Sequence, residues 1–336
     1  MRKFSGILAA SALLASIVFV APAAHASETI TGSGSSFMNS FQQTCSALYT
    51  TNKANYTSTG SSTGLSQFKA GTTNFGGTDN AYTSSPPSNF TYVPLVGGAI
   101  TIAYNVPGLT NLRLDAKTIG GIFDGTIKTW DAAAIKKLNP TAKLPKENIQ
   151  VVYRSDGSGT SNNFSNYLKQ VVGGTWTVSS TWTTAVGKTP VPGIGSATNQ
   201  GVTSTVAQTK FSITYADPAD AKKNKLTFAA IQNAAGQFVK PTSGAAGKLI
   251  ASMPIPEDGL LTFDYTKKIK GAYPIALVAY GLAPTASTTP AKSAAVKDYF
   301  TYLIKTCGPQ RASSGDYVPM LGKAQAKALE LIAKIK

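Results

Sequence analysis

Strand-like and helix-like segments alternate along the whole chain. Runs rich in β-branched and aromatic residues, which favour strands, lie at 92–107, 148–153, 211–216, 226–231 and 273–282. Helix-like segments lie between such runs and before them. In one of these, Phe37, Phe41 and Cys45 recur every four residues and so share one helix face. This alternation predicts an α/β fold with mainly parallel sheets, because consecutive parallel strands are usually joined by a helix.

The N-terminus has the composition of an export signal. Arg2 and Lys3 precede an apolar run over residues 7–20, and Ala-His-Ala follows at 24–26. This order predicts a signal peptide over residues 1–26 that is removed after export to the periplasm, or to the outside of the cell. The apolar run is shorter than the roughly 20 residues that span a bilayer, and a retained anchor is the alternative interpretation. No cysteine follows the run, so no lipid anchor is expected.

The only histidine, His25, lies inside the predicted signal peptide. The mature chain would therefore lack an imidazole, which excludes catalysis by a histidine base. Residues 60–64 match the G-x-S-x-G elbow of serine hydrolases, but that elbow works with a histidine. The two cysteines are distant and the carboxylates form no dense cluster, so a metal site is not expected either. We expect neither an enzyme nor a cofactor.

The chain carries a formal net charge of +16. One interpretation is a solvated, lysine-rich surface that keeps the protein soluble. The other is an electric field that draws in small anions. Nucleic acid is not an expected partner, because the lysines are scattered and no basic block is interleaved with aromatic residues.

Cys45 and Cys307 are the only cysteines in the sequence. In an exported protein such a pair favours a disulfide, which would bring the beginning of the chain beside its end. The long loop that it closes would make it worth roughly 5 kcal/mol in the chain-entropy model. Two buried thiols are the alternative.

Three glycine- and hydroxyl-rich turns each precede a helix-like segment. They are TGSGSSF at 31–37, GSSTGLSQF at 60–68 and DGSGTS at 156–161. Hydroxyl residues at such positions are ordinary helix N-caps. Helix N-termini also collect anions, because their unpaired N–H groups and the helix dipole point the same way. Three such turns in one exported basic protein favour an anion site.

Arg154 and Asp156 open the last of these turns. The arginine fork matches two oxygens of a tetrahedral anion. Residues two apart in a strand lie on the same face, so Asp156 is expected to brace the guanidinium. An ordinary surface arginine at a strand end is the alternative for Arg154.

Asp79 is the unexpected member of the set, because a carboxylate repels an anion unless the anion brings a proton to donate. Hydrogen phosphate carries such a proton at neutral pH, whereas sulfate does not. A site that hydrogen-bonds a ligand hydroxyl can reject analogues without it by about four to five orders of magnitude. We interpret Asp79 as a filter for protonated oxyanions. A surface turn or cap aspartate is the alternative.

Four motifs, in order, resemble the phosphate-binding loops of the periplasmic phosphate-binding proteins of ABC-type uptake systems. They are TGSGSSF at 31–37, GSSTG at 60–64, FGGTD at 75–79 and RSDGSGTS at 154–161. Supporting matches lie at 96–109, 114–140 and 273–281. The resemblance covers most of the chain and weakens after Gly195, where the segment 211–220 lacks the glycine that the family usually has before its tyrosine.

The resemblance implies a type II two-lobed binding protein, with two α/β lobes built on central mixed sheets and joined by two hinge strands. Lobe I would comprise residues 27–104 and 273–336, and lobe II residues 105–272. The crossings would lie near Asn105 and Tyr273. Cys45 and Cys307 would then fall in the same lobe.

The resemblance also implies a ligand set. The implied phosphate-binding residues are Ser36, Phe37, Ser61, Asp79, Arg154, Ser158, Gly159 and Thr160, with Asp156 bracing the arginine. Position 36 is often Thr in the family, and either hydroxyl can donate.

The implied function is capture of hydrogen phosphate or dihydrogen phosphate by a monomer that delivers it to an ABC-type permease. A secreted phosphate-scavenging or adhesion protein of the same fold is the alternative. Specificity for another oxyanion is a further one, with arsenate expected to compete. An exported serine hydrolase or phosphatase is less well supported.

Overall fold

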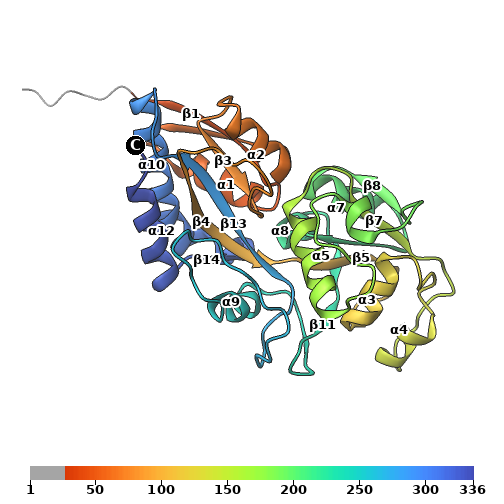
Figure 1. Cartoon of the computed structure of the whole chain (residues 1–336). Coiled ribbons are helices and arrows are strands. Elements are labelled where there is room, and N and C mark those ends of the chain that lie inside the picture. Colours follow the sequence, from red (N-terminus) through yellow and green to blue (C-terminus); the bar gives the residue numbers. More distant parts are fainter. Residues whose placement is uncertain (1–26) are drawn as a thin grey trace, which may run out of the picture.

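The computed structural model describes residues 27–336, so the predicted signal peptide over residues 1–26 lies outside the described residues. Within residues 27–336, no helix is both long enough and apolar enough to cross a membrane. The described chain forms two halves, each built on its own sheet, which lie side by side in Figure 1. We call the half with the six-stranded sheet the first lobe and the half with the five-stranded sheet the second lobe.

The first lobe contains the sheet with strand order β14-β4-β13-β3-β1-β2. These strands are β1 (Thr29–Gly34), β2 (Lys53–Ser58), β3 (Phe75–Thr78), β4 (Phe90–Ala99), β13 (Ala276–Pro284) and β14 (Tyr317–Pro319). Its helical segments are α1 (Asn39–Leu48), α2 (Ser61–Lys69), α9 (Ser243–Ala251), α10 (Pro290–Tyr302), η1 (Leu303–Cys307), α11 (Gly308–Arg311), η2 (Ser313–Gly315) and α12 (Lys323–Ala333).

The second lobe contains the sheet with strand order β10-β5-β9-β7-β8. These strands are β5 (Thr101–Asn105), β7 (Gln150–Arg154), β8 (Ile194–Ser196), β9 (Ser212–Ala216) and β10 (Thr227–Phe228). Its helices are α3 (Ala116–Phe123), α4 (Ala133–Leu138), α5 (Gly159–Val171), α6 (Trp182–Val186), α7 (Thr198–Gln208) and α8 (Pro218–Lys223). A small third sheet joins β6 (Arg113–Leu114), β11 (Ala230–Gln232) and β12 (Phe238–Val239).

Both main sheets are mixed, as the resemblance implied, rather than mainly parallel. β1 runs parallel to β2 and β3, but β13 runs antiparallel to β3 and β4. In the second lobe β7 runs parallel to β8 and β9, whereas β5 runs antiparallel to β9 and β10. The antiparallel pairings join strands that are distant in the sequence, and periodicity carries no information about such partners.

The chain changes sheets at Ile100, between β4 and β5. The Ile100 N–H donates to the Ile275 carbonyl at 2.8 Å, and the Tyr273 hydroxyl donates to the Ile100 carbonyl at 3.0 Å, so this crossing lies beside the segment that leads into β13. β5 thus belongs to the second lobe, and α9 packs on β4, β13 and β14 of the first lobe. β5 falls outside the boundary expected near Asn105, because β4 and β5 form one uninterrupted apolar run in the sequence. The chain returns to the first lobe before α9 begins at Ser243, and not near Tyr273 as the resemblance implied.

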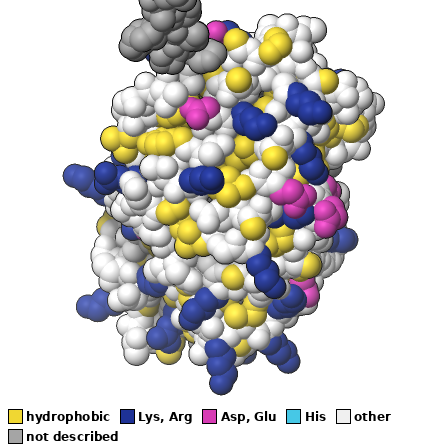
Figure 2. Space-filling model, turned by 90° about the vertical axis from the view of Figure 1, so that its left-hand side faces the viewer, with side chains coloured by type: hydrophobic (Ala, Val, Ile, Leu, Met, Phe, Trp, Pro, Cys, Tyr) yellow, Lys and Arg dark blue, Asp and Glu magenta, His cyan; other side chains and the backbone are white. Residues whose placement is uncertain are grey.

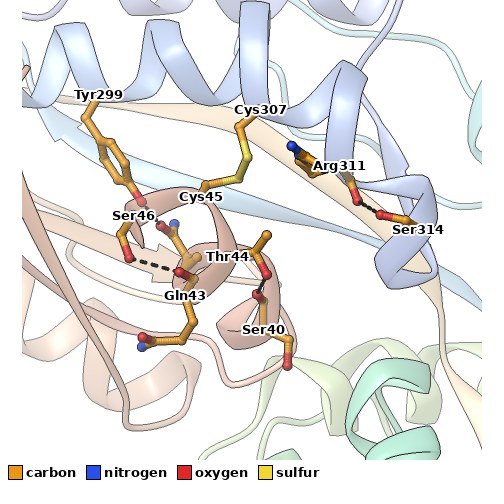
Figure 3. Close-up of a disulfide and its surroundings, with 10 residues drawn as sticks. Ser40, Gln43, Thr44, Cys45, Ser46, Tyr299, Cys307, Arg311 and Ser314 are labelled. Atoms are coloured by element: carbon orange, nitrogen blue, oxygen red, sulfur yellow. Dashed lines mark hydrogen bonds between the residues drawn. A yellow bond between two sulfur atoms is a disulfide. The ribbon is translucent and has the colours of Figure 1, made fainter. Parts of the chain in front are cut away.

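The disulfide between Cys45 and Cys307 is confirmed, and no described cysteine is free. It joins α1 to η1 across 262 residues, with the two Cα atoms 5.8 Å apart (Figure 3). Both residues belong to the first lobe, so the bridge ties the two ends of the chain together inside one lobe.

Lysine and arginine side chains are spread over the face shown in Figure 2, with hydrophobic and uncharged polar residues between them. They form no single dense block on this face. The basic residues on this face are scattered, as the lysines are in the sequence.

Candidate anion-binding site

The site lies between the lobes, where strands of both sheets end. In the first lobe, Ser36 and Phe37 follow β1, Ser61 begins α2 soon after β2, and Asp79 follows β3. In the second lobe, Arg154 ends β7 and Ser158 caps α5. Ligand sites of open α/β sheets lie at the carboxyl ends of strands. All eight residues implied as ligands are buried: Ser36, Phe37, Ser61, Asp79, Arg154, Ser158, Gly159 and Thr160.

Contacts between the lobes bring these residues together. The Thr160 hydroxyl of the second lobe donates to an Asp79 carboxylate oxygen of the first at 3.3 Å. The Asn163 side-chain amide donates to the Asp79 carbonyl at 2.7 Å. The Ser62 N–H donates to the Gly157 carbonyl at 3.0 Å. The structure is therefore closed around the site.

Glycines make this closure sterically possible. A Cβ at Gly159 would lie 2.5 Å from the Ser61 hydroxyl oxygen and 2.7 Å from the Asp79 Cβ. Gly60 has a φ of 87°, and a Cβ there would lie 2.3 Å from an Asp156 carboxylate oxygen. None of these three distances is possible without a shift of the atoms, so a side chain at either position would push the lobes apart.

Arg154 is 1% exposed and uses only part of its guanidinium within the protein. Its Nε donates to Asp156 Oδ1 at 2.7 Å and its Nη2 donates to Asp156 Oδ2 at 2.5 Å. This is the bidentate brace that the sequence led us to expect. Nη1 is buried and has no hydrogen-bond partner among the described residues. Buried donors on a charged group are rarely left unpaired, and Nη1 is available to donate to a bound anion.

Asp79 is 4% exposed, and burial raises its pKa to about 6. The hydrogen bond from Ser35 and the positive charge of Arg154 partly oppose that rise. The Ser35 hydroxyl donates to Asp79 Oδ1, and the Asp79 N–H donates to the Ser61 hydroxyl oxygen at 3.2 Å. Ser35 was not among the predicted residues, although it lies inside the first motif.

Ser158 is the N-cap of α5, the first of the two interpretations given to such hydroxyl residues. Its hydroxyl oxygen accepts a hydrogen bond from the Ser161 N–H at 3.1 Å, so it is an N-cap. Because α5 begins at Gly159, the N–H groups of Gly159 and Thr160 have no intrahelical acceptor. The N-terminus of α5 thus adds helix-dipole donors to the arginine.

Asn199, near the start of α7, was missed by the sequence analysis. Its N–H and its side-chain amide both donate to the Ser36 hydroxyl oxygen at 3.0 Å. The same amide lies 3.4 Å from the Thr160 hydroxyl oxygen. Asn199 falls in the region after Gly195 where the resemblance weakens, and no local pattern singles it out.

Two α/β lobes with a buried cationic and hydroxyl-lined cluster between them define a two-lobed periplasmic binding protein of type II. A family model described as a PBP superfamily domain matches residues 20–306. The protein "Phosphate-binding protein PstS" of Xylella fastidiosa is 37% identical over 304 residues, which cover 87% of this chain and 81% of that protein. The chain belongs to the PBP superfamily and, within it, to the PstS family.

Solved structures show the same fold. A "high affinity periplasmic phosphate-binding protein (PfluDING) bound with phosphate" superposes with a TM-score of 0.75 at 23% identity, covering 89% of this chain and 92% of that one. An "ABC-type phosphate transport receptor from Vibrio cholerae" superposes with a TM-score of 0.53 at 17% identity, covering 86% and 99%. The predicted fold class is confirmed. The PstS relatives are binding proteins rather than enzymes, as expected for this chain.

Proposed function

We propose that this protein binds inorganic phosphate, one anion per chain, in the buried cluster between its lobes and delivers it to an ABC-type permease. The observation that carries the proposal is the unpartnered Nη1 of Arg154, which is buried beside helix N-terminal donors. A tetrahedral oxyanion would supply the missing acceptor. Membership of the PstS family favours phosphate as that oxyanion.

The hydroxyl groups are oriented to donate to such a guest. A serine oxygen has two acceptor positions and one hydrogen. Both acceptor positions of Ser36 are filled by Asn199, and the oxygens of Ser61 and Ser158 each accept a backbone N–H. The Ser36 hydroxyl can therefore interact with the anion only as a donor, and Ser61 and Ser158 each keep a hydrogen that these contacts do not use.

Two members of the set have internal partners that the ligand would replace. The Phe37 N–H donates to the Ser35 hydroxyl oxygen at 3.1 Å, and the Thr160 hydroxyl donates to Asp79. Rotation of the Ser35 side chain would free the Phe37 N–H, and rotation of the Thr160 side chain would turn its hydroxyl toward a phosphate oxygen. The Thr160 rotation would also leave Asp79 Oδ2 to accept the hydrogen of phosphate.

Asp79 supplies the selectivity in this proposal. An ionised Asp79 accepts the hydrogen that hydrogen phosphate carries, whereas sulfate offers none and meets a buried negative charge. The pKa of about 6 means that Asp79 is mostly ionised at neutral pH in the ligand-free site. The positive charge of Arg154 stabilises the ionised form.

The uptake role is preferred to a secreted scavenging or adhesion role because the relatives are PstS proteins. We further propose that residues 1–26 are a cleaved signal peptide, that the chain works in the periplasm, and that it is a monomer. The resemblance of the N-terminus to an export signal supports the first two points.

Titration calorimetry of the mature protein with phosphate and with sulfate at pH 7 tests the proposal. We expect one phosphate per chain and an affinity for sulfate at least about a thousandfold weaker. Equal affinity for the two anions would remove the role given to Asp79. No binding of either anion would remove the proposed function.

A further inference from the structure

Asp217 is a buried acid that the anion site does not use directly. It follows β9, caps the N-terminus of α8 in the second lobe and is 0% exposed. Its Oδ2 lies 2.9 Å from the hydroxyl of Tyr317, which belongs to β14 of the first lobe. The contact therefore crosses the interface between the lobes.

Counting hydrogens shows that this contact needs a second proton. The Tyr317 hydroxyl lies 2.9 Å from Asp217 Oδ2 and also 2.9 Å from the Phe37 carbonyl oxygen. A phenol has one hydrogen, and a carbonyl oxygen can only accept. If Asp217 were ionised, one of the two contacts would bring two acceptors together without a hydrogen. With a proton on Asp217, the acid donates to Tyr317 and Tyr317 donates to Phe37.

The surroundings of Asp217 favour the protonated form. Its Oδ1 is buried and has no hydrogen-bond partner among residues 27–336. Burial and the neighbouring Asp220 raise the pKa of Asp217 well above its usual range. Burial also raises the pKa of Tyr317, so the phenol keeps its hydrogen. The other charged groups near this acid pair are Lys223, Arg154 and the ion-paired residues Lys222 and Asp316.

Asp217 reaches the first anion loop by two routes. Its side chain acts through Tyr317 on the carbonyl of Phe37. Its backbone N–H donates to the Asn199 side-chain oxygen at 3.0 Å, which turns the Asn199 amide toward Ser36. Both routes end on the loop whose hydroxyl and N–H groups are proposed to bind phosphate.

We propose that Asp217 is a positioning residue for the phosphate site: as a protonated acid it donates to Tyr317 across the lobe interface and, with Asn199, holds the Ser36–Phe37 loop in its binding position. This inference rests on the proposed function. Separation of the lobes would part Asp217 from Tyr317 and expose it to water, where an aspartate ionises near pH 4. Closure then takes up one proton, and this contribution to phosphate affinity is lost as pH rises.

The test compares Asp217→Ala and Asp217→Asn with the unmodified protein by phosphate calorimetry from pH 6 to pH 8.5. Asp217→Ala is expected to weaken binding about 10- to 100-fold, since it leaves Tyr317 without its donor. Asp217→Asn is expected to restore much of this loss, because its amide donates to Tyr317 at every pH. Because only the unmodified protein takes up this proton, its Kd for phosphate should rise with pH relative to that of Asp217→Asn. The Kd of Asp217→Asn divided by the Kd of the unmodified protein should therefore fall by up to about tenfold per pH unit as pH rises.

Phosphate and Asp79 titrate in the same way in all of these proteins, so their titration does not affect a ratio of Kd values taken at equal pH. Asp264→Asn, a change at an exposed carboxylate, is the matched control and should follow the unmodified protein throughout. Tyr317→Phe removes the acceptor of the Asp217 hydrogen, and in that background Asp217→Asn should bind phosphate no better than Asp217→Ala.

Parallel pH profiles for the unmodified protein and Asp217→Asn would overturn the inference, as would Asp217→Asn binding no better than Asp217→Ala. Failure of the unmodified protein to bind phosphate at any pH would instead overturn the proposed function. Far-ultraviolet circular dichroism of each variant shows that it is folded. If Asp217→Ala does not fold, the Asp217→Asn and Tyr317→Phe profiles decide the question alone.

Discussion

The Thr160 hydroxyl in the second lobe lies 3.3 Å from a carboxylate oxygen of Asp79 in the first. The sequence separates the two residues by 81 positions, and they meet only because the lobes close on each other. The contact places the Asp79 carboxylate, which can accept a proton, beside hydrogen-bond donors of the second lobe. A site of this composition suits an anion that carries both negative charge and a hydrogen.

Changing Arg154 to Leu should raise the Kd for phosphate about 100- to 1000-fold, because it removes the only buried cation proposed to contact the ligand. Calorimetry at pH 7 measures the effect. Arg311→Leu, at an exposed position of the first lobe, is the control and should bind normally. Normal binding by Arg154→Leu would show that the anion sits elsewhere.

Changing Asp79 to Asn should narrow the preference for phosphate over sulfate by about 100-fold or more, because the amide can donate to either anion. The Kd values for both anions at pH 7 give the ratio. Ser61→Ala removes a neighbouring hydroxyl but keeps the carboxylate, so it should weaken phosphate and sulfate binding by similar factors. An unchanged ratio in Asp79→Asn would contradict the filter role.

Changing Gly159 to Ala should weaken phosphate binding by about 100-fold or more, because a Cβ at 2.5 Å from the Ser61 hydroxyl oxygen blocks closure. Gly244→Ala is the matched control: this residue is also in the first turn of a helix, and a Cβ there meets nothing within 4 Å. The control should bind as the unmodified protein does. Equal Kd values for both variants would mean that closure is not required.

Replacing both Cys45 and Cys307 by Ala should lower the free energy of unfolding by about 3–5 kcal/mol, because the unfolded chain regains the freedom of a long loop. Urea denaturation measures this loss. The Kd for phosphate should change less than about threefold, since both cysteines lie within the first lobe and neither is in the anion cluster. A large loss of affinity would indicate that the bridge shapes the site.

Local patterns predicted the parts of the site that are local. The glycine- and hydroxyl-rich turns do begin helices, with α2 starting at Ser61 and α5 at Gly159, and Asp156 does brace Arg154. Phe41 and Cys45 lie on the buried side of α1, as their spacing indicated, whereas Phe37 is buried in the turn before that helix.

Contacts between distant segments could not be predicted in this way. Asn199 reaches Ser36 across 163 positions, and Tyr317 reaches Phe37 across 280. No spacing rule connects such residues, and the first depends on lobe closure. The change of sheet at Ile100 was also hidden, because the residues on both sides of it are equally apolar.

A crystal structure of the mature protein with phosphate tests the central claim most directly. The account predicts one anion between the lobes, with one oxygen about 2.7–3.1 Å from Arg154 Nη1 and another at similar distance from an Asp79 carboxylate oxygen. An anion bound away from these two atoms, or no anion between the lobes at saturating phosphate, would contradict it.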